Sequence, residues 1–365
     1  MKIFRNGAYE SIYDMPIQIN WDLTTRCNYR CSYCFIYGRG KTTPQKLPFS
    51  TLNQLKNAVD NIASLNRPWY DVHFSGGEPT IHPHMIDLIY MLHEKLQDRL
   101  NQITIISNGS RNENVYEKLV EISKSIYLIL GISIHTDHVD MAHILELIEK
   151  LSNRVNLSFG LMFNPAKREE VHLIYDIMCE YRKKFPFGMS IDILRDDDHV
   201  DTRYTQEDFA WQKSATEKFV AIEDSVASKF PSSKQPKHNF RLFHDIEFNG
   251  ERQMIESADY NSNLTEGLSK FTGMYCIAHT AVLRIEANGL CHGMVCGADP
   301  IICNIFEKGS LKAARDDLIH AIVCPCDICG CSVNHPIPKF SSRLEAARFI
   351  EVVDAKQQAL FDATQ

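Results

Sequence analysis

Three cysteines stand close together in the stretch Thr25-Arg26-Cys27-Asn28-Tyr29-Arg30-Cys31-Ser32-Tyr33-Cys34-Phe35. Their spacing is C-x3-C-x2-C, and an apolar run at 17–24 comes directly before them. Three thiolates on one short loop can bind three irons of a cubane cluster and leave the fourth iron open to a ligand that the protein does not supply. A structural zinc ion would need a fourth protein ligand, and the nearest histidine is distant, at His73. The triplet therefore favours an iron–sulfur cluster over zinc.

Short apolar runs alternate with helical patterns on the C-terminal side of this triplet. Between the runs, apolar residues recur at helical spacing, as at Leu52, Leu55 and Val59. Such alternation is typical of βα units around a parallel sheet. Six strands with about five helices predict an α/β fold, a partial (β/α)6 TIM-like barrel that stays open. The expected strands lie at 17–24, 71–74, 103–107, 127–134, 155–163 and 189–194.

Polar and glycine-rich motifs follow three of these strands. The sequence Ser75-Gly76-Gly77-Glu78-Pro79-Thr80 follows the second, Ser107-Asn108-Gly109 the third, and Ser133-Ile134-His135 the fourth. Two adjacent glycines let a backbone approach a ligand closely, and Glu78 can accept hydrogen bonds from a cationic amine. Taken alone, each motif could also be an ordinary loop between a strand and a helix.

Taken with the triplet, these loops resemble the radical S-adenosylmethionine superfamily, in which an aromatic residue, here Tyr33, stands just before the third cysteine. The resemblance implies that Cys27, Cys31 and Cys34 bind a 4Fe-4S cluster. It also implies that S-adenosylmethionine binds the open iron and is cleaved to a 5′-deoxyadenosyl radical, which abstracts a hydrogen atom from substrate. By the same resemblance the cofactor contacts are Tyr33, Gly76, Gly77, Glu78, Pro79, Ser107, Asn108, Ser133 and Met162.

A second group of cysteines occupies the last third of the chain. It resembles the SPASM and Twitch subfamilies, in which cysteines around a hairpin and a helix bind one or two auxiliary 4Fe-4S clusters. The ending C-x-C-x2-C-x-C departs from the SPASM spacing, so a zinc knuckle at 324–331 and some free thiols remain alternatives. The resemblance makes candidate ligands of Cys276, Cys291, Cys296, Cys303, Cys324, Cys326, Cys329 and Cys331. Cys179 is expected to be a core thiol.

The expected domain organisation follows these motifs. Residues 1–195 form the barrel, 196–272 a helical and hairpin bridge that could bind substrate, 273–340 the auxiliary-cluster domain, and 341–365 a C-terminal helix. Because the triplet begins at Cys27, we expect no peptide-recognition domain before it.

The composition and the N-terminal sequence restrict the expected cellular compartment and the classes of binding partner. The N-terminus has no apolar signal segment, and no run of about 18 apolar residues is present, which predicts a cytoplasmic protein with reduced thiols and no membrane partner. Its 39 basic and 46 acidic residues give a net charge of −7, so no nucleic acid is expected. By resemblance, flavodoxin or ferredoxin supplies the electron.

Three functions remain open. The first is oxidative modification or cross-linking of a peptide or protein side chain. The second is dehydrogenation or epimerisation of a sugar, a cyclitol or a nucleoside-like small molecule. The third, an electron-transfer or metal-binding scaffold, leaves the motifs at Gly76 and Asn108 unexplained. Candidate catalytic residues are His135, at a position where many relatives carry Asp, and Cys291 or Cys303, if either is a free hydrogen donor.

Overall fold

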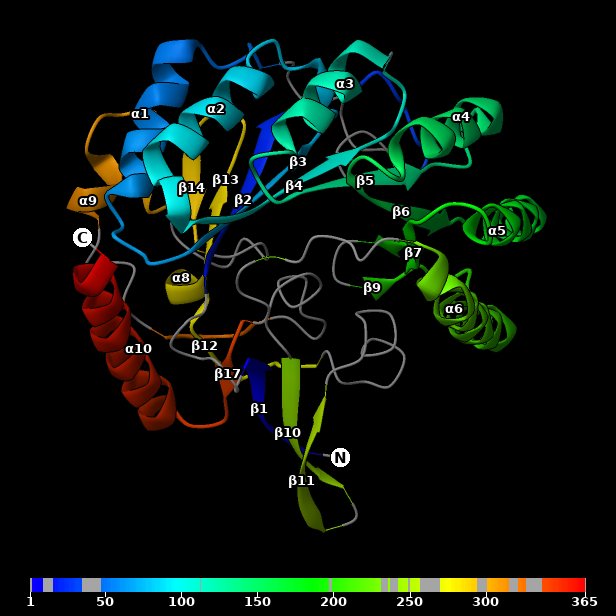
Figure 1. The fold of residues 1–365 in the computed structure, drawn as a ribbon. Helices are drawn as coiled ribbons and strands as arrows, with labels where there is room; N and C mark the ends of the chain where they lie inside the picture. The colour runs from blue at the N-terminus through cyan, green and yellow to red at the C-terminus, as the bar shows by residue number, and fades with distance from the viewer. Residues whose placement is uncertain are drawn as a thin grey trace.

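Within the residues that it describes, the computed structural model of the chain contains two large sheets and one small one. In Figure 1 the nine-stranded sheet lies above the six-stranded sheet. The described residues are 2–8, 16–34, 47–111, 113–196, 199–230, 236, 242–248, 250–256, 270–293, 301–314, 321–325 and 337–364. Four of the candidate ligands therefore lie outside them, namely Cys296, Cys326, Cys329 and Cys331.

Six consecutive parallel strands, β2 to β7, form one side of the nine-stranded sheet, whose order is β15-β14-β13-β2-β3-β4-β5-β6-β7. Each of the six overlaps in sequence with one of the predicted strands, so the predicted partial barrel is confirmed. They are β2 (Ile17–Thr24), β3 (Tyr70–Gly76), β4 (Leu100–Ser107), β5 (Leu128–Ile134), β6 (Asn156–Phe163) and β7 (Gly188–Ile193).

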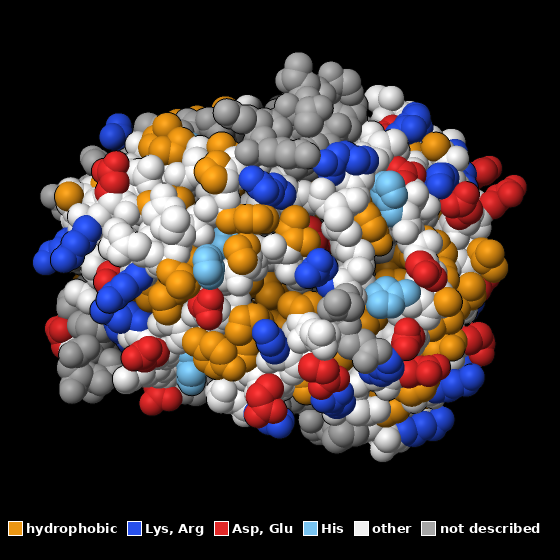
Figure 2. All heavy atoms as spheres, turned by 90° about the horizontal axis from the view of Figure 1, so that it is seen from above, with side chains coloured by type: hydrophobic (Ala, Val, Ile, Leu, Met, Phe, Trp, Pro, Cys, Tyr) orange, Lys and Arg blue, Asp and Glu red, His pale blue; other side chains and the backbone are white. Residues whose placement is uncertain are grey.

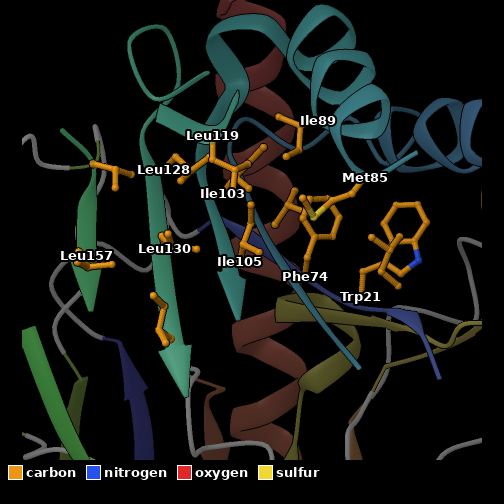
Figure 3. Packing of buried hydrophobic residues seen from close by; sticks show 14 of the residues in the cluster. Trp21, Phe74, Met85, Ile89, Ile103, Ile105, Leu119, Leu128, Leu130 and Leu157 are labelled. Atoms are coloured by element: carbon orange, nitrogen blue, oxygen red, sulfur yellow. The ribbon is translucent and has the colours of Figure 1, made fainter. Parts of the chain in front are cut away.

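Helices cover one face of this sheet and leave its other face to polar residues. Alternate apolar side chains of the strands point at the helices, as Trp21, Phe74 and Ile105 do in Figure 3. Alternation along a strand sends the intervening residues, such as Asp22 and Ser75, to the opposite face. The helices are α1 (Leu52–Ala63), α2 (Met85–Leu96), α3 (Glu113–Ile122), α4 (Met141–Leu151), α5 (Arg168–Arg182) and α6 (Gln206–Val226).

The helix α6 belongs with the barrel, although the sequence assigns its residues to a bridge. Tyr175 of α5 donates its hydroxyl hydrogen to the carbonyl of Ala215 at 2.8 Å. Gln212 donates to the carbonyl of Ile191 on β7 at 3.4 Å. These contacts make α6 the helix of the sixth βα unit. The domain boundaries as such stay predictions.

A bidentate ion pair fixes the first turn of α6 to α5. Arg168 donates from Nε and Nη2 to the two carboxylate oxygens of Asp208, at 2.6 and 2.7 Å. These hydrogen bonds hold the pKa of the buried Asp208 carboxyl at about 2. We expect Asp208→Asn to lower the free energy of unfolding by about 2 kcal/mol, because a charge-assisted pair at a buried position is lost. Thermal unfolding checks this, and the exposed Asp176→Asn on α5 should change stability by less than about 0.5 kcal/mol.

The chain returns to the barrel after leaving it. Strand β13 (Val282–Ile285) pairs in parallel with β2, and β14 (Leu290–His292) and β15 (Cys303–Asn304) extend the same sheet. Asn61 of α1 donates to the carbonyl of Ile305 at 2.8 Å, which ties the segment leading to α9 (Ser310–Ala313) to the barrel. The nine-stranded sheet therefore runs across the domain boundary expected at 273.

The six-stranded sheet joins segments from both ends of the chain, in the order β11-β10-β1-β17-β12-β16. Helices α8 (Ala278–Ala281) and α10 (Arg343–Thr364) follow β12 and β17 in the chain. The strands are β1 (Lys2–Ala8), β10 (Leu242–Phe248), β11 (Glu251–Glu256), β12 (Tyr275–Cys276), β16 (Ile322–Val323) and β17 (Lys339–Phe340). The small sheet pairs β8 (Arg195–Asp196) with β9 (His199–Val200).

The outer surface shows no single sign of charge on the side seen from above in Figure 2. Lys and Arg side chains are interspersed with Asp and Glu side chains over this face. Among the described helices, none is both long and apolar enough to cross a lipid bilayer.

Candidate active site at the open end of the barrel

Two loops meet at the carboxyl ends of β2 and β3. The amide of Gly77 donates to the carbonyl of Thr24 at 2.6 Å, and that of Glu78 donates to the carbonyl of Arg26 at 2.8 Å. Gly76 has a φ of +111°, and a Cβ atom on Gly77 would lie 2.1 Å from the Arg26 oxygen. Only glycine fits such close backbone contact. The glycine pair thus lies beside the first cysteine of the triplet.

The triplet forms a half-buried loop directly after β2. The amide of Cys34 donates to the carbonyl of Cys31 at 3.1 Å. The Sγ atom of Cys27 accepts from the amide of Tyr29 at 3.4 Å and from Nδ2 of Asn108 at 3.8 Å. Burial raises the pKa of Cys31 to about 12. Its thiol therefore keeps its proton at neutral pH until a metal displaces it, and donors to sulfur stabilise the ligated thiolate.

Glu78 connects the second strand end with the third. Its side chain is fully buried. Oε1 accepts from the amide of Thr80 at 3.0 Å and from the hydroxyl of Ser107 at 2.9 Å, and Oε2 accepts from the amide of Asn108 at 2.7 Å. Pro79 follows as the first residue of the 3-10 turn η2 (Pro79–Ile81), which Glu78 caps. The structure thus brings four predicted cofactor contacts together, while a direct bond from Glu78 to the cofactor stays a prediction.

The loop after β5 holds the triplet from the other side. Nδ1 of His135 lies 3.0 Å from the hydroxyl of Tyr33, and burial lowers the pKa of His135 to about 4. The carboxylate of Asp137 accepts from the amide of Ser32 at 2.7 Å. Next to it, Nε2 of His138 accepts from the amide of Arg30 at 3.1 Å. This loop therefore orders the backbone between the cysteines.

Asp137 and His138 were not predicted as site residues. Their one sequence signal is their position just past the end of a barrel strand, where polar side chains meet those of other strands. Ser133 and His135 line one small pocket with Tyr29 and Asn108, which confirms that the third and fourth strand ends lie together.

The polar face of the barrel carries charged residues that the sequence analysis also missed. Asp22 of β2 accepts from the hydroxyl of Ser75 on β3 at 3.0 Å and from Nη2 of Arg284 on β13 at 2.9 Å. Across the barrel, a Cβ atom on Gly160 would lie 2.6 Å from Oδ2 of Asp192 and 3.2 Å from Cε of Met162. Gly160 therefore leaves room for an acidic side chain beside the predicted contact Met162.

The buried His82 makes the stability of the folded chain depend on pH. Its Nδ1 accepts from the amide of His84 at 3.2 Å, its Nε2 lies 3.0 Å from the hydroxyl of Ser50, and burial lowers its pKa from 6.5 to about 4. The unfolded chain takes up this proton below about pH 6.5 while the folded chain does not, so stability is lost as the pH falls toward 4.

We expect His82→Asn to lower the free energy of unfolding at pH 7. Between pH 7 and pH 4, the free energy of unfolding of this variant should fall by on the order of 2 kcal/mol less than that of the wild type. Unfolding measured at several pH values checks this. The half-exposed His93→Asn on α2 is the control, and an equal acid loss in both variants would contradict the assignment.

The four described cysteines of the C-terminal region fall into two groups. The amide of Cys324 donates to the carbonyl of Met274 at 2.8 Å, and Cys276 and Cys324 share one buried apolar cluster. Cys291 and Cys303 stand opposite each other on β14 and β15.

The donors present fit a cluster on the triplet. Three thiols project from one loop, and amide groups donate to the sulfur of Cys27. Within the described ranges, no three His, Cys, Asp or Glu side chains are close enough to hold a single metal ion. A cubane instead bonds each thiolate to a different iron, which spreads the sulfurs apart.

Comparison with known proteins agrees with this site. Residues 21–159 match the family model described as the Radical SAM superfamily. Residues 21–159 therefore carry a radical SAM domain, and the cofactors of that superfamily are a 4Fe-4S cluster and S-adenosylmethionine. The resemblance read from the triplet and the Gly76–Pro79 motif is confirmed.

The relatives are distant. The chain is 24% identical over 132 residues to the antilisterial bacteriocin subtilosin biosynthesis protein AlbA of Bacillus subtilis, and the match spans 36% of this chain but only 27% of AlbA. Streptococcus suis SuiB bound to S-adenosylmethionine superposes with a TM-score of 0.50 at 16% identity, over 83% of this chain and 66% of SuiB. Native anSMEcpe with bound AdoMet and Cp18Cys peptide gives 0.52 at 14% identity, over 96% of this chain and 100% of anSMEcpe. At these identities the two structures show that the fold is shared.

Proposed function

We propose that this chain is a radical S-adenosylmethionine enzyme that oxidatively modifies or cross-links a side chain of a peptide or protein. The observation that carries the proposal is the contact between the triplet loop and the glycine loop, in which the amides of Gly77 and Glu78 bind the carbonyls of Thr24 and Arg26. This contact supports the proposal because it brings the loop of the three candidate thiol ligands against a glycine-lined backbone, at one end of a barrel with a polar interior.

The protein's own residues position the cluster and S-adenosylmethionine and do not themselves react. Cys27, Cys31 and Cys34 would hold the cluster, which with S-adenosylmethionine supplies a 5′-deoxyadenosyl radical once an electron arrives from a flavodoxin or ferredoxin. Asn108 donates toward the sulfur of Cys27 and is itself held by Glu78 through its amide. The loop after β5 fixes the remaining backbone of the triplet.

The substrate class rests on what the relatives are named for. AlbA is named for bacteriocin biosynthesis, SuiB has been seen bound to the precursor peptide SuiA, and anSMEcpe with the Cp18Cys peptide. Within the described part of the expected substrate region 196–272, the longest elements are α6, which packs on the barrel, and the β10–β11 hairpin in the other sheet. We assign peptide binding to the hairpin, because α6 is occupied by its contacts with α5 and β7.

An oxidative outcome needs an electron acceptor after hydrogen abstraction. Among the described candidate ligands, we assign Cys276 and Cys324, which share one buried cluster, to an auxiliary 4Fe-4S cluster that would supply such an acceptor when bound. Cysteines outside the described residues would complete its ligand set.

The test measures the transfer of deuterium from the substrate into 5′-deoxyadenosine. The reconstituted and reduced protein is incubated with S-adenosylmethionine and with extract from cells grown on deuterated amino acids, separated by size and with or without protease treatment. We expect deuterium to enter 5′-deoxyadenosine from the peptide fraction and protease to abolish that transfer. Transfer that comes only from protease-resistant small molecules would favour the sugar, cyclitol or nucleoside alternative.

A further inference from the structure

Cys291 and Cys303 face each other across two antiparallel strands. They are direct partners in the register of β14 with β15, and each thiol is the largest influence on the pKa of the other. Opposed residues of an antiparallel pair have Cα atoms about 4.5 to 5.5 Å apart. A disulfide bridges Cα atoms about 4.4 to 6.8 Å apart. The two sulfurs can therefore bond with little backbone movement.

The pair lies in the barrel core and apart from the other two described cysteines. Cys291 is 0% exposed and packs in the same apolar cluster as Ile285, Ile305 and Leu311, whereas Cys276 and Cys324 belong to a different cluster. The pair therefore lies in a different packing environment from Cys276 and Cys324.

Access to the pair is one-sided. Cys303 is half-buried, while Cys291 lies behind it in the core. Cys303 is thus the thiol that solvent and a small disulfide reach first.

We propose that Cys291 and Cys303 bind no iron and form a dithiol site that a low-molecular-weight disulfide closes reversibly to a protein disulfide. The thiolate of Cys303 attacks one sulfur of the small disulfide, and a mixed disulfide forms as one small thiol leaves. Cys291 gives up its proton and attacks the sulfur of Cys303, which releases the second small thiol. The protein loses two electrons and two protons, and the small disulfide gains them.

One consequence concerns the auxiliary sites. With this pair set aside, six C-terminal cysteines remain, which suffice for one cluster with four cysteine ligands and not for two. They are Cys276, Cys296, Cys324, Cys326, Cys329 and Cys331.

The first test measures the disulfide. The anaerobic iron-loaded protein is equilibrated with oxidised and reduced glutathione at several ratios, its free thiols are alkylated, and its peptides are analysed by mass spectrometry. We expect one linked peptide pair, Cys291 with Cys303, that disappears on reduction and is absent from Cys303→Ser. If both thiols are alkylated at every glutathione ratio, the proposal is wrong.

The second test measures iron and sulfide without relying on activity. We expect the Cys291→Ala/Cys303→Ala variant to hold as much iron as the wild type, and Cys276→Ala/Cys324→Ala to hold about four irons fewer. Cys179→Ala, which removes a buried thiol from α5, controls for loss of packing. A loss of about four irons from the first variant with unchanged circular dichroism would overturn the proposal. If the wild type holds only about four irons, the auxiliary cluster of the proposed function fails, while the glutathione experiment still tests the dithiol site.

Discussion

Simultaneous replacement of Cys27, Cys31 and Cys34 by alanine is expected to abolish reductive cleavage of S-adenosylmethionine. The three side chains project from the one loop that the Gly77 and Glu78 amides hold against the barrel, and no other described thiol lies on that loop. We expect 5′-deoxyadenosine to fall to the level of a protein-free blank and the iron content to fall by about four per chain. Mass spectrometry of the nucleoside and iron analysis measure the two effects.

The same experiment separates an enzyme from an electron-transfer scaffold. Cys179→Ala should retain both iron and cleavage, because that thiol is buried on α5 far along the chain from the triplet. If the triple variant still cleaves S-adenosylmethionine, the assignment of the cluster to this loop is wrong.

Gly77→Ala is expected to have the second largest effect, although it changes no ligand. The added Cβ atom would lie 2.1 Å from the carbonyl oxygen of Arg26, which is a backbone atom that cannot turn aside. Relief of this clash requires the triplet loop to separate from the end of β3. We expect a loss of roughly 3 kcal/mol or more of stability and a clear loss of bound iron.

A matched glycine on the same sheet provides the control. At Gly188 of β7 a Cβ atom would meet nothing nearer than Oγ of Ser158 at 3.5 Å, an ordinary contact. Gly188→Ala should therefore leave iron content and thermal stability close to those of the wild type. Equal losses in the two variants would show that the effect of Gly77→Ala is not specific to the triplet.

Local patterns were enough to predict the barrel and much of its site. Apolar residues recur at alternate positions of the strands because helices cover one of their faces, and the order of β2 to β7 in the sheet follows their order in the chain. The triplet and the Gly76–Pro79 motif are contiguous in sequence, so their chemistry could be recognised before their geometry was known.

Features that depend on distant contacts were not predicted. The buried face of α6 includes Asp208 and Gln212, whose polar side chains interrupt the apolar stripe and form hydrogen bonds with α5 and β7. Arg284 reaches Asp22 because β13 pairs with β2, and no local pattern specifies which sheet a hairpin joins. Asp137 and His138 accept hydrogen bonds from backbone amides of the triplet, and only their position just past β5 indicates such a role in the sequence.

The pairing of β2 with β13 also bears on how the protein is made. On a ribosome, β2 is complete at Thr24, but the strand that covers its free edge is finished only at Ile285. At ordinary elongation rates the interval is on the order of tens of seconds. During that time an apolar edge strand, with the cysteine triplet at its end, is open to other chains. Slower translation or lower temperature during expression should therefore change the soluble yield more than it changes the stability of the finished protein.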